Sequence, residues 1–422
     1  MNQALVILYA LLCLALLIGG LGRRGGIYEY PFLASAMSVA FILPQLPGLT
    51  DNMFLPENGF ARTLVFTTAC LGMSAFGWRC SARPLLPRPI PLNEGRLLLA
   101  AAALSAAGAG FYVAVGRLPP DTVVSTAISG VPVVLLFFSK MLVFGLAIAA
   151  LCAARRPSWF AFAIILCDAA LYFDRVFVTG KRGEALEFFL IVALALWFQR
   201  RRAVPAGLAL IVVLGGVLGM ASTEDYRAIT RRGETPGIED VAKIDFVGNF
   251  ENLVSGGGAE FQNAIMKIDL SARTQSYDYG LYHWNELVMA FVPGQVVGDA
   301  VKRSLLVEVP GMADRFYEPS YGTTDTGMAD AFGSFGYLGI VKFFFVAWIM
   351  RRIYRGAMRG DASSQILYML SALPSVHVIS HHTQWIFTSW IHMAIFLGPA
   401  LFFARVRERP AAGPALTGAP AA

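Results

Sequence analysis

The turn Gly180-Lys181-Arg182-Gly183-Glu184, continued by ALEFFLIVALALWFQ at 185–199 and by Arg200-Arg201-Arg202, contains the pattern that decides the fold. Its apolar part approaches the length of a membrane-crossing helix, which needs about 20 residues at a rise of roughly 1.5 Å each. A short charged turn precedes this part and an arginine triplet follows it. The order predicts a spanning helix whose arginine-rich end lies in the cytoplasm.

The same pattern recurs along the whole chain of 422 residues. We expect about eleven spans, with bounds near 4–21, 31–49, 61–78, 95–116, 130–153, 158–174, 184–199, 204–221, 335–350, 364–380 and 385–404. A membrane barrel would instead show alternating segments of roughly ten residues. The expected fold is therefore an all-α, polytopic integral membrane helix bundle.

Arginines fall on every second connection between these spans, as the positive-inside rule requires. The connections expected in the cytoplasm contain Arg23-Arg24, Arg79/Arg83/Arg88, Arg155-Arg156, Arg200-Arg201-Arg202, Arg351-Arg352/Arg355/Arg359 and Arg405/Arg407/Arg409. The remaining connections are expected to face outward, to the periplasm of a bacterial cell. The longest of these connections, residues 222–334, separates the first group of spans from the last.

We divide the chain into a bundle of about eight spans (1–221), a large periplasmic loop (222–334), further spans (335–404) and a disordered cytoplasmic tail (405–422). Within the loop, apolar residues recur at helical spacing between 240 and 270. They predict two amphipathic helices on either side of Gly256-Gly257-Gly258, lying on the membrane or on the bundle.

Composition supports a membrane protein. The chain is 56% hydrophobic and 15% charged, with a mean hydropathy of +0.58, whereas soluble domains carry about 25% charged residues. Its net charge of +6 is explained by arginines that flank the spans, rather than by nucleic-acid binding. The cysteines have no CxxC spacing, so neither a disulfide framework nor a zinc site is predicted.

Two sets of cations lie in outward connections, where the charge bias would not place them. Lys181 and Arg182 stand between two glycines at the start of a helix, where guanidinium and free backbone N–H groups suit a phosphate. Arg227, Arg231 and Arg232 open the large loop and can hold a second phosphate group. Interfacial anchoring explains the first set equally well, and a solvated entry segment explains the second.

Candidate acids and bases lie on the same side. Asp325 stands at the membrane boundary as a general base or as a cap of the next helix. His283, Glu184 and His382 are the other candidates, and His382 belongs to a cluster with His377 and His381 for which we predict no metal. Inside the spans, Lys140 and Asp168 are expected to be functional or to pair with each other.

The turn from Thr179 to Glu184 is similar to the G-x-R-G turn of bacterial O-antigen polymerase-like proteins, the oligosaccharide repeat unit polymerases. The loop segments around Tyr277-Asp278-Tyr279-Gly280, Pro293-Gly294 and Phe332 to Gly339 also resemble that family, over roughly residues 130–350. Many members have Pro-Arg where this chain has Pro293-Gly294, so this chain departs from the family there and the resemblance implies no arginine role at that position.

This resemblance implies a metal-independent, GT-C-like glycosyltransferase of O-antigen, capsule or exopolysaccharide biosynthesis in the bacterial inner membrane. It would polymerise oligosaccharide repeat units linked to a polyprenyl (undecaprenyl) pyrophosphate on the periplasmic face, without a cofactor. Lipid-linked donor and acceptor would be its substrates, and a flippase and a chain-length regulator its possible partners. Arg182 and Lys181, helped by the loop arginines, would hold the pyrophosphate, and Asp325, His283, Glu184 or His382 would act as base.

Three other functions stay open at this level. An O-antigen ligase transfers a finished glycan to another acceptor and shares the same plan. A transporter of polysaccharide precursors usually shows internal repeats and broken helices in matching halves, and we find neither here. A membrane scaffold in an export machine would tolerate loss of Arg182.

Overall fold

The computed structural model describes residues 1–80, 83–118, 131–179, 182–222, 225–226, 243–309, 317, 319 and 323–406, without the side chains of 175–179 and 182. Within these residues the chain is all-helical, as expected, and its β contact is an isolated bridge between Leu92 and Arg405. The predicted tail from 407 onward lies outside the described residues.

The first half of the chain contains α1 (Asn2–Leu21), η1 (Gly26–Tyr28), α2 (Tyr30–Met37), η2 (Ser38–Ile42), η3 (Leu43–Gln45), η4 (Pro47–Leu49), α3 (Gly59–Cys80), α4 (Glu94–Gly116), α6 (Val131–Ser139), α7 (Met141–Arg155), α8 (Trp159–Thr179), α9 (Arg182–Arg200) and α10 (Ala206–Ala221). The second half contains α13 (Phe246–Gly256), α14 (Ala259–Thr274), α15 (Leu281–Phe291), α16 (Gly294–Val297), α17 (Asp299–Ser304), α19 (Thr326–Phe335), η5 (Gly336–Gly339), α20 (Ile340–Met358), α21 (Ala362–Ser380), α22 (Gln384–His392), η6 (Met393–Leu397) and α23 (Gly398–Ala404).

Each apolar run predicted as a span falls on a helix or on a series of helical segments. In the described residues, six helical stretches are long and apolar enough to cross a membrane: Asn2–Leu21, Gly59–Cys80, Glu94–Gly116, Val131–Arg155, Thr326–Met358 and Gln384–Ala404. Two shorter apolar stretches are Tyr30–Gln45 and Ala206–Ala221. The chain is therefore a helical protein with helices long and apolar enough to cross a membrane, and the larger count of about eleven spans stays a prediction.

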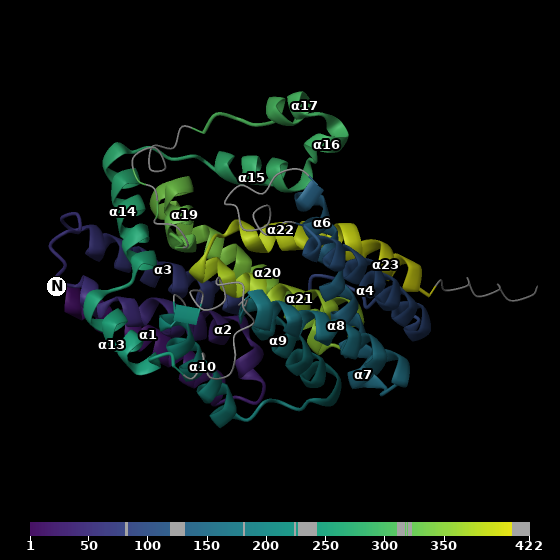
Figure 1. Cartoon of the computed structure of the whole chain (residues 1–422). Helices are drawn as coiled ribbons and strands as arrows, with labels where there is room; N and C mark the ends of the chain where they lie inside the picture. The colour runs from purple at the N-terminus through teal and green to yellow at the C-terminus, as the bar shows by residue number, and fades with distance from the viewer. Residues whose placement is uncertain are drawn as a thin grey trace, which may run out of the picture.

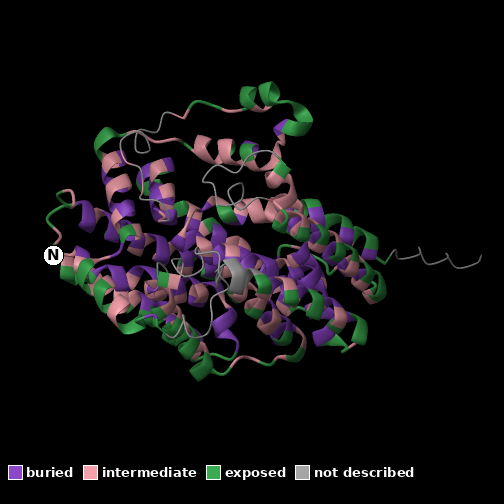
Figure 2. Ribbon diagram, viewed as in Figure 1, coloured by how far each residue is buried: buried purple, intermediate pink, exposed green. Residues whose placement is uncertain are grey.

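Helices α20 and α21 run through the middle of the bundle, and α3, α2 and α9 pack around them (Figure 1). Figure 2 shows the buried residues concentrated in this central region and the exposed ones on the outer helices. Tyr368 of α21 and Phe343 of α20 are among the largest fully buried side chains. The core is thus built around the two helices that follow the large loop.

The two amphipathic helices predicted in the loop are confirmed as α13 and α14. Helix α14 buries Phe261, Ile265 and Ile268 and packs against α3 and α19, so it lies on the bundle. Its Asp269 accepts a hydrogen bond from Arg62 of α3 at 2.8 Å. Helices α15, α16 and α17 form a separate layer above α22 in Figure 1.

The contact between α3 and α20 depends on a glycine. A Cβ at Gly77 would overlap the backbone carbonyl of Phe344, whereas a Cβ at Gly72 of the same helix would meet nothing within 4 Å. Small residues allow helix backbones to approach closely in membranes, where packing replaces the hydrophobic driving force. Gly77 therefore sets the distance between the two helices.

Gly77→Ala should destabilise the protein by about 1–3 kcal/mol, because overpacking forces two helix backbones apart. The measurement is unfolding of the purified chain by sodium dodecyl sulfate in mixed micelles. Gly72→Ala is the matched control and should be neutral or stabilising by up to about 1 kcal/mol. Equal stability of the two variants would contradict the assigned contact.

Candidate functional site

A cluster of charged and polar side chains lies where α14, α15, α19 and α20 meet the turn between α21 and α22. It contains the carboxylates Asp325 and Asp330, two lysines and two histidines. We call this group, made of Asp325, Asp330, Lys267, Lys342, His283 and His382, the carboxylate cluster. Two predicted bases, His283 and His382, and the predicted Asp325 are thus brought together from segments distant in sequence.

Asp325 occupies the N-cap position of α19 but makes no capping hydrogen bond with its side chain. The capping role left open by the sequence is therefore wrong. One carboxylate oxygen lies 2.6 Å from Nζ of Lys267, and the other lies 3.5 Å from Nε2 of His382. The buried carboxylate is held between a cation and an imidazole, an arrangement that can orient a general base.

His382 is the more accessible histidine of the cluster, with 26% of its side chain exposed against 17% for His283. Its Nε2 faces Asp325, while its Nδ1 is buried and has no hydrogen-bond partner among the described residues. A buried polar atom without a partner is uncommon in proteins. His382 therefore keeps one ring nitrogen able to accept a proton.

Asp330 is engaged on both carboxylate oxygens. Its Oδ2 accepts hydrogen bonds from the backbone N–H and the hydroxyl of Thr383, both at 2.6 Å. Its Oδ1 lies 3.5 Å from Nζ of Lys342 and 3.3 Å from Nε2 of His283. This carboxylate joins α19 to α20 and to the turn after α21, so it holds the site together.

His283 uses both ring nitrogens within the protein. Nζ of Lys342 lies 2.5 Å from its Nε2, and Oε1 of Gln384 lies 3.3 Å from its Nδ1. Gln384 donates its amide to Glu286, so its carbonyl oxygen is an acceptor toward His283. Because Nε2 also lies 3.3 Å from Oδ1 of Asp330, both ring nitrogens are engaged by neighbouring side chains. The predicted base role of His283 is therefore less favoured by the geometry than that of His382.

The start of α9 lies against α21 close to the cluster. A Cβ on Gly183 would lie 3.9 Å from the His377 ring, and the His377 and His381 rings are 5.0 Å apart. Glu184 is half-buried in the first turn of α9. The structure thus places the start of α9 and the histidine turn at the same end of the bundle.

The structure does not describe the side chains of the predicted phosphate ligands. Arg182 is the first residue of α9, but its side chain lies outside the description. Lys181, Arg227, Arg231 and Arg232 also lie outside the described residues. Their assignment as anion ligands stays a prediction.

Lys267 and Lys342 were not among the site residues predicted from the sequence, and Asp330 was given no role distinct from that of Asp325. A usable signal existed for Lys342, because it is a charge within the predicted span 335–350 and such charges are costly unless paired. The same rule drew attention to Lys140 and Asp168. Of these two, Asp168 accepts a hydrogen bond from Ser105 at 2.7 Å.

Among the described residues, no group of three or more His, Cys, Asp and Glu side chains is arranged to hold a metal ion. The cations of the carboxylate cluster are instead lysines, one for each aspartate. Comparisons with protein-family models, with curated proteins and with solved structures found no match.

Lys342→Met should destabilise the protein by about 3–5 kcal/mol, because it leaves the Asp330 carboxylate buried without its cation. Adding Asp330→Asn should restore part of the loss, since the uncompensated charge is then absent. The free energy of unfolding in mixed micelles measures both effects. Lys302→Met on α17 is the control, with an expected change within about 0.5 kcal/mol. A double variant less stable than Lys342→Met would contradict the pairing.

Proposed function

We propose that the chain is a membrane glycosyltransferase that polymerises polyprenyl-pyrophosphate-linked oligosaccharide repeat units on the outer face of the bacterial inner membrane. The observation that carries the proposal is the Asp325–His382 pair, which lies at the same end of the bundle as the start of α9. A base and an anion-binding turn are the two elements that this reaction needs. The resemblance of the Gly180–Gly183 turn to repeat unit polymerases supports the same function.

The reaction breaks the bond between the anomeric carbon of the donor sugar and the pyrophosphate oxygen. The bonding electrons leave with the lipid pyrophosphate, and the acceptor hydroxyl oxygen forms the new glycosidic bond. Fixed cations stabilise the charge that develops on the leaving group. In this proposal Arg182 and Lys181 supply them, together with backbone N–H groups at the start of α9.

In this proposal the proton of the acceptor hydroxyl goes to Nδ1 of His382, which is buried in the described structure, so the turn that carries it opens to the acceptor when substrate binds. Asp325 faces the opposite ring nitrogen, so its carboxylate orients the imidazole and stabilises the cation that forms. Nζ of Lys267, 2.6 Å from the other carboxylate oxygen, holds Asp325 in place. The Asp325–His382 distance of 3.5 Å is long for a hydrogen bond, as catalytic contacts often are before substrate is bound.

Aromatic residues beside the cluster support recognition of a glycan. Tyr279 and Trp284 are 68% and 48% exposed. Trp284 is held in place by a hydrogen bond from its indole N–H to the backbone oxygen of Leu305. A fixed, exposed ring on α15, the helix that also carries His283 of the cluster, suits the apolar face of a sugar.

The first experiment incubates the purified, reconstituted chain with a lipid-pyrophosphate-linked oligosaccharide and separates the products on a gel. A ladder spaced by one repeat unit supports the polymerase. A single transfer to an added lipid A-type acceptor would indicate a ligase instead. No product from folded protein with cognate substrate would favour transport or scaffolding.

Arg182→Ala should abolish the ladder while membrane insertion and expression stay unchanged, because the leaving pyrophosphate loses its guanidinium. Arg182→Lys should restore little activity, since an ammonium cannot make the bidentate contact. Arg202→Ala, an exposed arginine just beyond the other end of α9, is the matched control. Full activity of Arg182→Ala would remove this residue from the mechanism.

His382→Gln should lower kcat by about 10²–10⁴-fold, the usual contribution of general base catalysis. The measurement is the rate at which the product ladder forms with the reconstituted chain. His381→Gln, in the same turn, is the control and should keep the wild-type kcat. An unchanged kcat in His382→Gln would assign the base to another group.

A further inference from the structure

A cavity of about 520 Å³ lies between α1, α2, α3 and α20. It is separate from the carboxylate cluster, because Arg351 in its lining follows Lys342 of the cluster by nine residues on α20, roughly 13 Å along the helix. Its arginines belong to the connections that we expect on the cytoplasmic side. The inference drawn from it does not depend on the proposed function.

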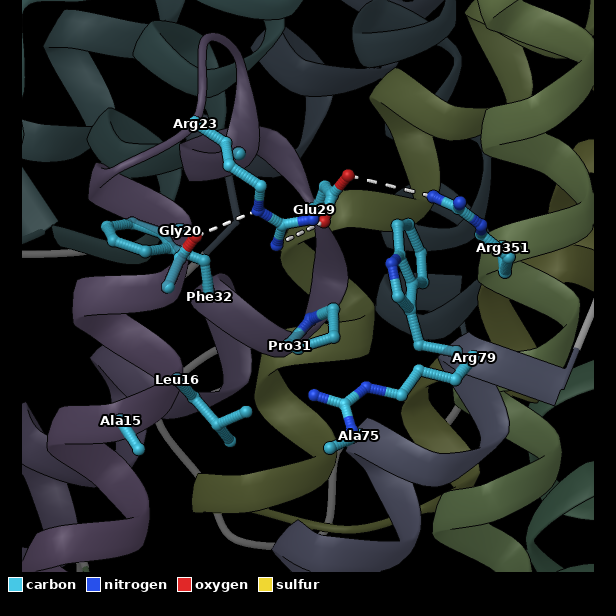
Figure 3. Close-up of a pocket in the computed structure, with 13 residues that line it drawn as sticks. Ala15, Leu16, Gly20, Arg23, Glu29, Pro31, Phe32, Ala75, Arg79 and Arg351 are labelled. Carbon is cyan, nitrogen blue, oxygen red and sulfur yellow. Dashed lines mark hydrogen bonds and ion pairs between the residues drawn. The ribbon is translucent and has the colours of Figure 1, made fainter.

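The lining of this cavity is rich in positive charge. Arg23, Arg79 and Arg351 contribute three guanidinium groups, and Glu29 contributes one carboxylate. The lining therefore has a formal charge of +2. Figure 3 shows these four side chains, with Arg23 and Arg351 each joined to Glu29 by a dashed line.

Two of the arginines are held in place by the protein. Arg23 donates to Glu29 at 3.0 Å and to the backbone oxygen of Gly19 at 2.9 Å. The guanidinium of Arg351 lies 3.6 Å from Glu29 and stacks on Trp78, 4.8 Å from the ring centroid. Nε of Arg351 is buried and has no hydrogen-bond partner in the described part of the chain. The Glu29 carboxylate thus pairs with both guanidinium groups, and the Nε–H donor of Arg351 stays unused.

Arg79 is the third cation, and it makes no hydrogen bond or ion pair with any other described residue. Three guanidinium groups line this one cavity, and a guanidinium can bind a phosphate through two parallel hydrogen bonds. Because the Arg79 side chain makes no internal hydrogen bond or ion pair, it is also the position at which this role can be tested with the least effect on the fold.

The other wall of the cavity is apolar. Ala15 and Leu16 of α1 line it together with Phe32 of α2 and Ala75 of α3, and Figure 3 shows Ala15 and Leu16 on the α1 side. The outer surface beside it is apolar as well, since Ile18 of α1 and Phe76 of α3 are 66% and 55% exposed. Such surfaces face the hydrocarbon in a membrane protein.

We infer that this cavity binds the phosphate headgroup of an anionic membrane lipid, with an acyl chain lying along the crevice between α1 and α3. Phosphate is the chemistry that the arginines recognise, and both a lipid and free inorganic phosphate carry it. The apolar wall selects the lipid, because a free ion would gain nothing from Ala15, Leu16 and Phe32. Anionic lipids are also attracted to arginines at the cytoplasmic surface.

The test titrates the whole purified chain in non-ionic detergent with dioleoyl phosphatidylglycerol, dioleoyl phosphatidylcholine or inorganic phosphate, and measures bound ligand by native mass spectrometry. Phosphatidylglycerol should bind about tenfold more tightly than phosphatidylcholine. Arg79→Gln should lose about tenfold in affinity for it, the usual size of one charge-assisted contact. Arg359→Gln, an exposed arginine outside the cavity, removes the same charge and should leave binding unchanged.

A second variant separates the two sources of phosphate. Ala15→Trp fills the apolar end of the cavity, so it should weaken phosphatidylglycerol binding and leave binding of inorganic phosphate unchanged. Equal effects of Arg79→Gln and Arg359→Gln would overturn the site. Phosphate binding that depends on Arg79, with lipid binding indifferent to Ala15→Trp, would overturn the lipid assignment. Absence of binding by all three probes to folded protein would overturn both.

Discussion

The buried carboxylate of Asp330 is the constraint on which the rest of the site depends. An ionised carboxylate in a low-dielectric interior is tolerated only when it is paired and hydrogen-bonded. Asp330 meets this condition by accepting from Thr383 and approaching Lys342, so it fixes α19 against α20 and the turn after α21. Asp325 lies one turn and a residue earlier, and the same anchoring places it beside His382. Gly327, whose Cβ would overlap the backbone of Val378, allows the close approach.

The helical framework was largely predictable from sequence, because apolar length and helical spacing are local properties. The span predicted at 95–116 is found as Glu94–Gly116, and the two helices around Gly256-Gly257-Gly258 were found as α13 and α14. The boundary at Gly336, where φ is +57°, also follows from a glycine visible in the sequence. The number of spans could not be predicted in the same way, because several predicted helices are shorter or less apolar than a bilayer requires.

The pairing of charges was predictable only in part, because it is a property of tertiary contacts. Asp325 stands where a helix cap is expected, yet its carboxylate turns to Lys267, which is 58 residues away. Asp168 and Lys140 were predicted to be functional or to pair with each other, and Asp168 accepts a hydrogen bond from a serine on α4. Sequence identifies which charges need partners, while the partner depends on which helix faces become neighbours. Lys342 shows this limit most clearly. The sequence indicates that its charge in a predicted span needs a partner, but it does not indicate which residues provide one.

The charge balance of the two ends of the molecule bears on what each can bind. In the carboxylate cluster, Lys267 and Lys342 are matched by Asp325 and Asp330, so these lysines have no surplus charge for a pyrophosphate. Any dianionic leaving group handled at that end must therefore be neutralised by cations from the start of α9 or the large loop. The cavity at the arginine-rich end has the opposite balance, because three guanidiniums share one carboxylate. An anion can enter that cavity without displacing an internal partner. At the carboxylate cluster, by contrast, an anion would need cations other than the two lysines that the aspartates already engage.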